Sequence, residues 1–350
     1  MEVINLEYLI LTIILWFGFY AIVVLSLNIE YGYGGIPNFG RSLAVLMGGV
    51  AVGGLMNRIL INIFKISGGI IEASGTAKSI VNSLIAEKPI LGIIILLASL
   101  GLAAVLGWVS GALFILPSAK LSEDYLAITL LAISEVTYLI SYYNVDFIGG
   151  YYGVSIPDVL AFIPGMQRIL IFTIILLLIT FGCYIFVEKL LNSPYGRVLR
   201  AMRENEFVAK AYGKNVMMLR VKTVALGSAL ASLAGALYSF YSVNVIATSF
   251  SRVEWTFYPI LMLLLGGAGN NAGALLGALV FVSTKILLIT YKFEITSALH
   301  LPFQAVWLEY ILFGVAMLLI LLYKPEGLIK EKPIFTKAVK KIVKAKQNQK

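Results

Sequence analysis

Several polar side chains lie within or beside long apolar runs of this sequence, and these are the positions where chemistry could occur. Glu135 follows Asp124 in one such run, which places its carboxylate about 16 Å along a helix, near the middle of a membrane. An intramembrane carboxylate is costly, so it indicates an ion or substrate site, or else an ion pair that fixes helix packing. Asn38 and Arg41 follow a glycine-rich break, where backbone amides and a fixed positive charge could hold a carboxylate; a short connecting loop is the other interpretation.

Conventional catalytic and metal-binding sets are missing from the sequence. It has one histidine, His300, and one cysteine, Cys183, so neither a disulfide framework nor a His/Cys zinc cluster can form. No GxxxxGK(S/T) motif for a phosphate-binding loop occurs. We therefore expect no metal, no cofactor and no ATPase activity of its own, and we do not expect an enzyme.

The composition places these side chains in a membrane. Of the 350 residues, 60% are hydrophobic and 13% are charged, whereas soluble proteins carry about 25% charge. Apolar runs of about 20 residues, the length that crosses the hydrocarbon core, recur along the chain. The sequence thus predicts an all-α polytopic protein of the plasma membrane with about nine segments (eight to ten), some short or broken. The segments are expected at 9–28, 36–56, 90–116, 122–141, 167–188, 216–241, 257–268, 272–291 and 306–323.

The positive charge is concentrated in two regions, one from the end of the fifth segment to the start of the sixth and one after the last segment. Eight basic residues lie between Lys189 and Lys222, and nine more lie between Lys324 and Lys350, out of 27 in total. By the positive-inside rule both regions are cytoplasmic, which with nine segments places the N-terminus outside and the C-terminus in the cytoplasm. This distribution argues for anionic membrane lipid as a partner of the tail rather than nucleic acid. We expect a transmembrane domain over 1–323, with a cytoplasmic loop at 189–215, and a basic tail over 324–350.

Small residues and turn residues indicate how the segments pack. Two faces carry small residues four apart, which typically marks close helix packing: Gly227, Ala231 and Gly235 on one, Gly269, Gly273 and Gly277 on the other. The turn with Gly266, Gly267 and Asn270 either borders a translocation path or is an ordinary cytoplasmic turn. An amphipathic helix is expected within 57–89, and Lys285 is expected to extend toward Lys292 at the membrane edge.

The cytoplasmic loop contains the most informative motif, Ser193-Pro-Tyr-Gly-Arg-Val-Leu-Arg-Ala-Met-Arg-Glu-Asn-Glu-Phe-Val-Ala-Lys-Ala-Tyr-Gly213. Ser193 followed by Pro194 is a typical helix start, because serine caps the first amides and proline has no N–H to leave unpaired. Gly213 suits a helix end. A short helix of this kind either lies on the membrane surface or docks into a groove of a partner.

This loop resembles the coupling loop of the permeases of branched-chain amino acid ABC importers. The resemblance continues in the Gly266–Gly277 region and in Lys324-Pro-Glu-Gly-Leu328, and in the pair Tyr125 and Glu135, and it covers about residues 20 to 330. It implies that the loop inserts into a cleft of an ATPase subunit. The residues implied at that contact are Arg200, Arg203, Glu204, Asn205, Glu206, Ala209 and Gly213. At the glycine break, however, Asn38-Phe39-Gly40-Arg41 stands where the family tends to have Ser-Leu-Gly-His.

The resemblance implies a permease subunit that translocates branched-chain amino acids or a similar small polar solute. It implies ABC ATPase subunits, a second related permease and an extracytoplasmic substrate-binding protein as partners. The glycines and tyrosines of the outer loop 142–166 fit either a surface that receives this binding protein or a plain extracellular loop. The candidate residues of the translocation path are Asn38, Arg41, Glu135, Gly266, Gly267 and Asn270. The alternative is an ion-coupled secondary transporter that uses Glu135 as its proton or sodium site.

Overall fold

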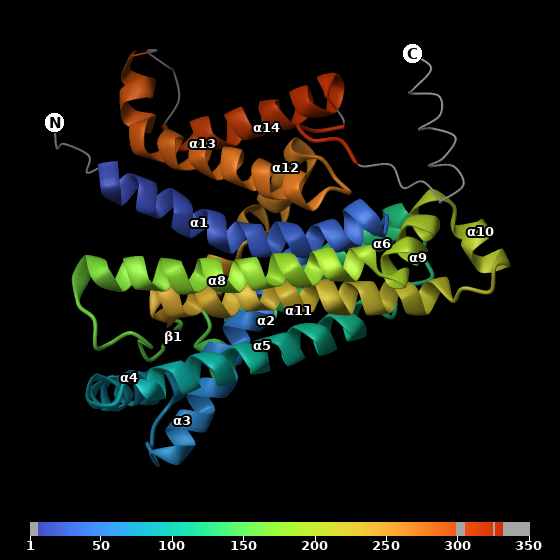
Figure 1. Cartoon of the computed structure of the whole chain (residues 1–350). Helices are drawn as coiled ribbons and strands as arrows, with labels where there is room; N and C mark the ends of the chain where they lie inside the picture. Colours follow the sequence, from blue (N-terminus) through green and yellow to red (C-terminus); the bar gives the residue numbers. More distant parts are fainter. Residues whose placement is uncertain (1–5, 299–304, 325, 332–350) are drawn as a thin grey trace.

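The computed structural model describes residues 6–298, 305–324 and 326–331, so most of the basic tail lies outside the described residues. The chain is helical almost throughout (Figure 1). The first half contains α1 (Leu6–Leu27), η1 (Asn28–Tyr33), α2 (Arg41–Gly49), η2 (Val50–Met56), α3 (Asn57–Ile63), α4 (Ile70–Glu87), α5 (Ile90–Ile115), α6 (Glu123–Tyr143) and α7 (Val145–Ile148). The second half contains α8 (Gly165–Asn192), α9 (Pro194–Glu204), α10 (Glu206–Ala211), α11 (Val216–Ser242), η3 (Ala247–Phe250), η4 (Val253–Phe257), α12 (Tyr258–Gly266), α13 (Asn271–Ala298) and α14 (Ala305–Tyr323).

Seven helices among the described residues are long and apolar enough to cross a membrane. They are Leu6–Tyr33, Arg41–Ile63, Ile90–Ile115, Glu123–Tyr143, Gly165–Asn192, Val216–Ser242 and Asn271–Lys292. The expected segment 257–268 forms the shorter helix α12, and the expected segment 306–323 forms α14, so neither is among the seven. The prediction of an all-helical membrane protein is confirmed.

Helix α11 lies in the centre of the bundle, in contact with α1, α2, α5 and α8. Its small residues allow this close approach, as the spacing predicted. A Cβ built on Gly235 would lie 1.9 Å from the carbonyl oxygen of Val45 in α2, and a Cβ on Gly277 of α13 would lie 2.1 Å from the carbonyl oxygen of Met262 in α12. Glycine at these positions therefore lets two helix backbones touch.

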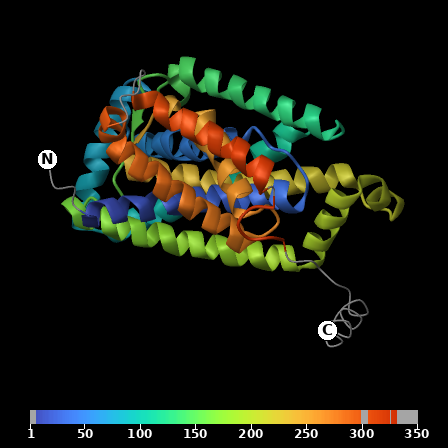
Figure 2. The same ribbon diagram turned by 90° about the horizontal axis from the view of Figure 1, so that it is seen from above.

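The two ends of the bundle differ. Helices α9 and α10 extend from one end, as Figures 1 and 2 both show. At the other end, strand β1 (Val154–Ser155) pairs antiparallel with β2 (Asn244–Val245), and α4 packs against β1. The helix predicted within 57–89 is confirmed as α4, which buries Ala73, Ala77, Val81 and Ile85, spaced four residues apart along one face.

Candidate functional site

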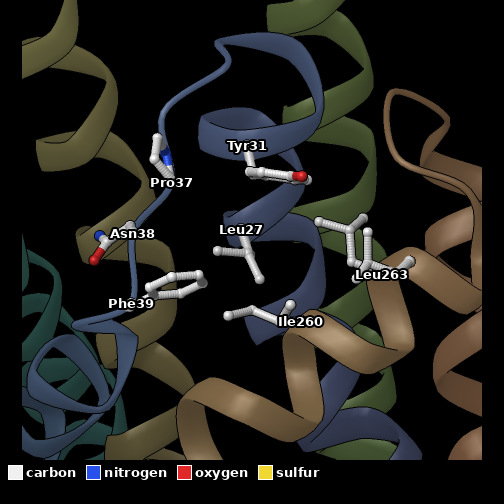
Figure 3. Close-up of a pocket in the computed structure, with 8 residues that line it drawn as sticks. Leu27, Tyr31, Pro37, Asn38, Phe39, Ile260 and Leu263 are labelled. Atoms are coloured by element: carbon white, nitrogen blue, oxygen red, sulfur yellow. The ribbon is translucent and has the colours of Figure 1, made fainter. Parts of the chain in front are cut away.

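The chain is non-helical between η1 and α2, and this break is where the structure brings polar residues together. Residues 34–40 run from the end of η1 to the start of α2, and Gly35 adopts a φ of +66° that favours glycine. Figure 3 shows this segment lying beside the helix that carries Leu27 and Tyr31. Irregular backbone within a membrane protein is stable only where protein or a water-filled cavity covers it, and Asn38 is correspondingly buried.

A buried ion pair closes the break. Glu30 of η1 and Arg41, the first residue of α2, form an ion pair in which both side chains are 0% exposed. Asn38 donates from Nδ2 to Glu30 Oε2 at 2.9 Å and accepts from the amide of Gly40 at 2.9 Å. The α11 backbone makes room for the carboxylate, because a Cβ on Gly227 would lie 2.0 Å from Glu30 Oε1. Asn38 and Arg41, which the sequence predicted as a pair, both contact a third residue, Glu30.

Glu30 is the site residue that sequence reasoning missed. The expected first segment ended at residue 28, which assigned Glu30 to a connecting loop. The available signal was an acid and an arginine on the two sides of a Gly- and Pro-rich break in an otherwise uncharged stretch. Such a pair is costly to bury unless the two charges meet.

A cavity of about 210 Å³ lies between the break, α1 with η1, and α12. Its lining is mostly apolar: Leu27, Tyr31, Pro37, Asn38, Phe39, Ile260, Leu263 and Leu264. In Figure 3 the ring of Phe39 extends toward Leu27 and Ile260, whereas the amide of Asn38 points away from them. The break therefore presents an apolar wall on one side and the buried ion pair on the other.

Helix α9 begins and ends as the sequence predicted. Ser193 Oγ accepts from the amide of Tyr195, and Pro194 is the first helical residue. Leu199 and Met202 are buried against the bundle. The hydroxyl of Tyr195 lies 2.8 Å from Thr223 Oγ1, and burial raises the pKa of this phenol above its ordinary value.

Two arginines of α9 contact the end of η1, and Arg203 also lies against Gly35 at the start of the glycine break. Arg203 donates from Nη1 to the carbonyl of Gly32 and forms an ion pair with Glu331 at 2.7 Å. The guanidinium of Arg200 lies 4.8 Å from the centre of the Tyr33 ring, within the range of a cation–π contact. The loop between α8 and α11 is thereby attached to the segment that carries the ion pair.

The other residues predicted at the coupling contact divide into two groups. Glu206 forms ion pairs with Lys210 at 2.8 Å and with Arg220 at 3.1 Å, and Ala209 is buried. Glu204, Asn205 and Gly213 are exposed, and the Asn205 side chain caps α10.

Phe207 and Tyr212 are the most exposed large hydrophobic side chains of this region, at 83% and 81%. Sequence reasoning did not single them out. The signal was the presence of two aromatic residues in a strongly charged stretch, where a helix lying alone in water has no need of them.

The Gly266–Asn271 turn lies near α9 and holds the start of the tail. Gly267 and Gly269 have φ of +110° and +81°. Leu328 donates its amide to the carbonyl of Leu265 at 2.8 Å, and Asn270 donates to the carbonyl of Lys330 at 3.1 Å. Asn28 accepts from the amide of Gly269 at 2.9 Å, so the turn is also attached to η1, the helix that leads into the break.

Glu135 lies apart from this assembly. Its neighbour Ser134 contacts Ser42 of α2 at 2.9 Å, oxygen to oxygen, but the Glu135 carboxylate turns outward to Arg252 at 3.4 Å. Both side chains are about as exposed as surface groups, at 38% and 49%. The structure therefore does not bring Glu135 together with Asn38 and Arg41.

The prediction that Lys285 extends to the membrane edge is wrong. Lys285 is buried, and its Nζ lies 2.6 Å from Glu254 Oε2 and 4.5 Å from the centre of the Tyr258 ring. Tyr20 donates to the same carboxylate oxygen at 2.5 Å. The apolar run around Lys285 contains no acidic residue near it, and the neutralising charge comes instead from Glu254, 31 residues away in sequence.

Comparison with known proteins places this arrangement in a family. The family model described as "Branched-chain amino acid transport system / permease component" matches residues 9–321. A protein of Methanocaldococcus jannaschii, described as "Probable branched-chain amino acid transport permease protein LivM", is 59% identical over 95% of this chain and 96% of its own length. The Escherichia coli "High-affinity branched-chain amino acid transport system permease protein LivM" is 24% identical over 66% of this chain and 56% of its own length. No solved structure matches the chain.

Proposed function

This chain belongs to the branched-chain amino acid transport permease family, and we propose that its solute passes beside the glycine break while separate ATPase subunits act through α9 and α10. The chain is the permease component of a branched-chain amino acid ABC transport system, a multi-pass membrane protein that is not itself an ATPase. The observation that carries the proposal is the attachment of α9 to the break through Arg203 and Gly32. A displacement of α9 is thereby transmitted directly to the segment beside the cavity.

The proposed topology has nine segments, with the N-terminus outside. Besides the seven long helices, α14 is the eighth segment of this topology, and η4 together with α12 is a ninth that crosses only part of the membrane. The basic loop at one end of the bundle supports a cytoplasmic position for α9, α10 and the tail 324–350. In this topology the transmembrane domain comprises 1–323, and the tail contacts anionic lipid.

Two permeases of this kind line one path in our proposal, and a substrate-binding protein delivers the solute to the outer end. Support for the outer contact comes from loop 142–166, where Tyr143, Tyr151 and Tyr152 are exposed. Tyrosine is common in binding surfaces because its ring packs well and its hydroxyl can still form hydrogen bonds. On the proposed path, Asn38 lines the cavity and Arg41 supports it from behind in the buried ion pair. Gly266, Gly267 and Asn270 lie at the cytoplasmic end of the path, and the role of Glu135 there stays a prediction.

The ATPase contact is proposed to rest on the exposed aromatics of α10 and the loop that follows. Arg200, Arg203 and Glu206 hold the loop to its own chain, with Ala209 packed beneath. Glu204, Asn205 and Gly213 face solvent beside Phe207 and Tyr212. Exposed aromatic anchors surrounded by polar groups are typical of the residues that dominate binding energy.

Replacing both Phe207 and Tyr212 by serine is expected to reduce the amount of ATPase that copurifies with the tagged permease at least tenfold. Loss of a single anchor of this kind typically costs about 2 kcal/mol or more, and tenfold corresponds to about 1.4 kcal/mol. The control is Tyr152→Ser, which removes another strongly exposed aromatic side chain, 71% exposed, at the opposite end of the bundle. Undiminished recovery of ATPase with the double variant would contradict docking through these residues.

A further inference from the structure

The cavity beside the glycine break has the chemistry of a site for an aliphatic side chain. We propose that Leu27, Phe39, Ile260 and Leu263 form the subsite that receives the branched side chain of the transported amino acid, and that they determine which side chains pass. This inference rests on the proposed function, because it identifies the part of the proposed path that selects among solutes by their side chains. The family match supplies the class of solute but no residue that contacts it.

The lining excludes charge and offers little to a polar group. None of the eight residues around the cavity is charged. Asn38 uses one amide hydrogen on Glu30 and one acceptor position on the amide of Gly40, and its side chain is directed to that side of the break (Figure 3). A charged or amide side chain in this cavity would lose its water and find few polar groups in exchange, chiefly the Tyr31 hydroxyl, so its transfer is disfavoured. An aliphatic side chain would instead gain from leaving water.

The size of the cavity fits a branched side chain. A dry apolar cavity of about 150 Å³ accommodates a benzene-sized group, and this cavity measures about 210 Å³. This volume is therefore large enough for the three- and four-carbon side chains of valine, leucine and isoleucine. Tyr31, which is 40% exposed, contributes the one hydroxyl among the lining residues.

The walls of the cavity belong to three different elements. Leu27 and Tyr31 lie at the end of the first span, Phe39 lies on the non-helical segment, and Ile260 and Leu263 lie on α12. Arg203 of α9 holds the carbonyl of Gly32, one residue after Tyr31. Discontinuous helices of this kind form the solute sites of other transporters. Displacement of α9 by the ATPases would thus change the spacing between the walls and release the side chain.

The test compares two solutes that differ by one methylene in the complete transporter, reconstituted with its partner permease, ATPases and binding protein. Ile260→Phe fills the cavity from α12, and Leu178→Phe is the matched control, because Leu178 lies on the exposed surface of α8. Uptake of leucine and of valine is measured for each variant and divided by the wild-type rate for the same solute, which cancels the selection made by the binding protein. We expect Ile260→Phe to lower leucine uptake at least tenfold and valine uptake clearly less.

Equal losses for leucine and valine would overturn the inference, since they would indicate a packing defect or a cavity filled by a lipid acyl chain. Unchanged uptake of both would overturn it as well. Ile260→Ala is expected to have the opposite effect. Because this substitution enlarges the cavity, uptake of phenylalanine should rise relative to uptake of leucine. ATP hydrolysis stimulated by the binding protein verifies that each variant is folded and assembled. Failure of the proposed function itself is distinguishable, because it would appear as absence of ATP-driven uptake in the wild type.

Discussion

Replacing Glu30 by leucine will leave Arg41 as an unpaired charge in the bundle and will destabilise the protein by about 3–5 kcal/mol, the usual cost of removing one partner from a buried ion pair. Both side chains are fully buried, and Asn38, the remaining polar neighbour, directs its amide N–H rather than its oxygen toward the carboxylate. The loss is to be measured as a fall in the unfolding temperature of the detergent-solubilised protein.

Two further variants make this expectation specific. The double variant Glu30→Leu, Arg41→Met should recover most of the lost stability, because replacing both members of a buried pair by apolar residues is often neutral or stabilising. Glu135→Leu is the matched control: its ion pair with Arg252 is partly exposed, and exposed pairs contribute about 1 kcal/mol or less. If Glu30→Leu unfolds at the same temperature as Glu135→Leu, the ion pair between Glu30 and Arg41 does not stabilise the protein as we expect.

The second large effect concerns coupling. Arg203→Ala is expected to reduce leucine uptake by the complete transporter at least tenfold while ATP hydrolysis stays within about twofold of wild type. Arg203 connects α9 to the carbonyl of Gly32 and to Glu331, and removing two hydrogen bonds of a charged donor costs about 1.5–3 kcal/mol each. The proposed docking residues Phe207 and Tyr212 are untouched, so the ATPases remain bound but no longer move the break. Uptake and phosphate release are to be measured on the same proteoliposomes.

Controls on the same helix separate coupling from general damage. Arg197 also lies on α9 but is exposed, so Arg197→Ala should leave both rates unchanged. Arg203→Lys keeps the charge but loses the planar fork that reaches two acceptors, and should show an intermediate loss of uptake. A proportional loss of uptake and ATP hydrolysis in Arg203→Ala would contradict the assignment, because it would mean that Arg203 acts in docking.

Much of the fold follows from features that are local in sequence. The apolar runs predict the long spans, and the expected segment 257–268, which has only 12 residues, forms the shorter helix α12. Ser193 and Pro194 predicted the start of α9 because capping depends on neighbouring residues alone. The small residues around Gly235 predicted close packing for the same reason, although not which helix would be the neighbour.

The site was only partly predictable, because its contacts join residues that are distant in sequence. Asn38 and Arg41 were identified from the break, but Glu30 lay beyond the end of an apolar run. Lys285 was misplaced since its partner Glu254 belongs to another element, the π-helical η4. The contact between Arg203 and Gly32 spans 171 residues and leaves no periodic pattern in the sequence.

The most direct test of this account is the energy source of transport. The complete transporter is reconstituted in proteoliposomes, and uptake of labelled leucine is followed with ATP supplied on the side of the ATPases, or with proton and sodium gradients and no ATP. We predict uptake that requires ATP, is indifferent to the gradients and persists in Glu135→Gln. Uptake driven by a gradient without ATP and abolished by Glu135→Gln would contradict the account and support an ion-coupled carrier.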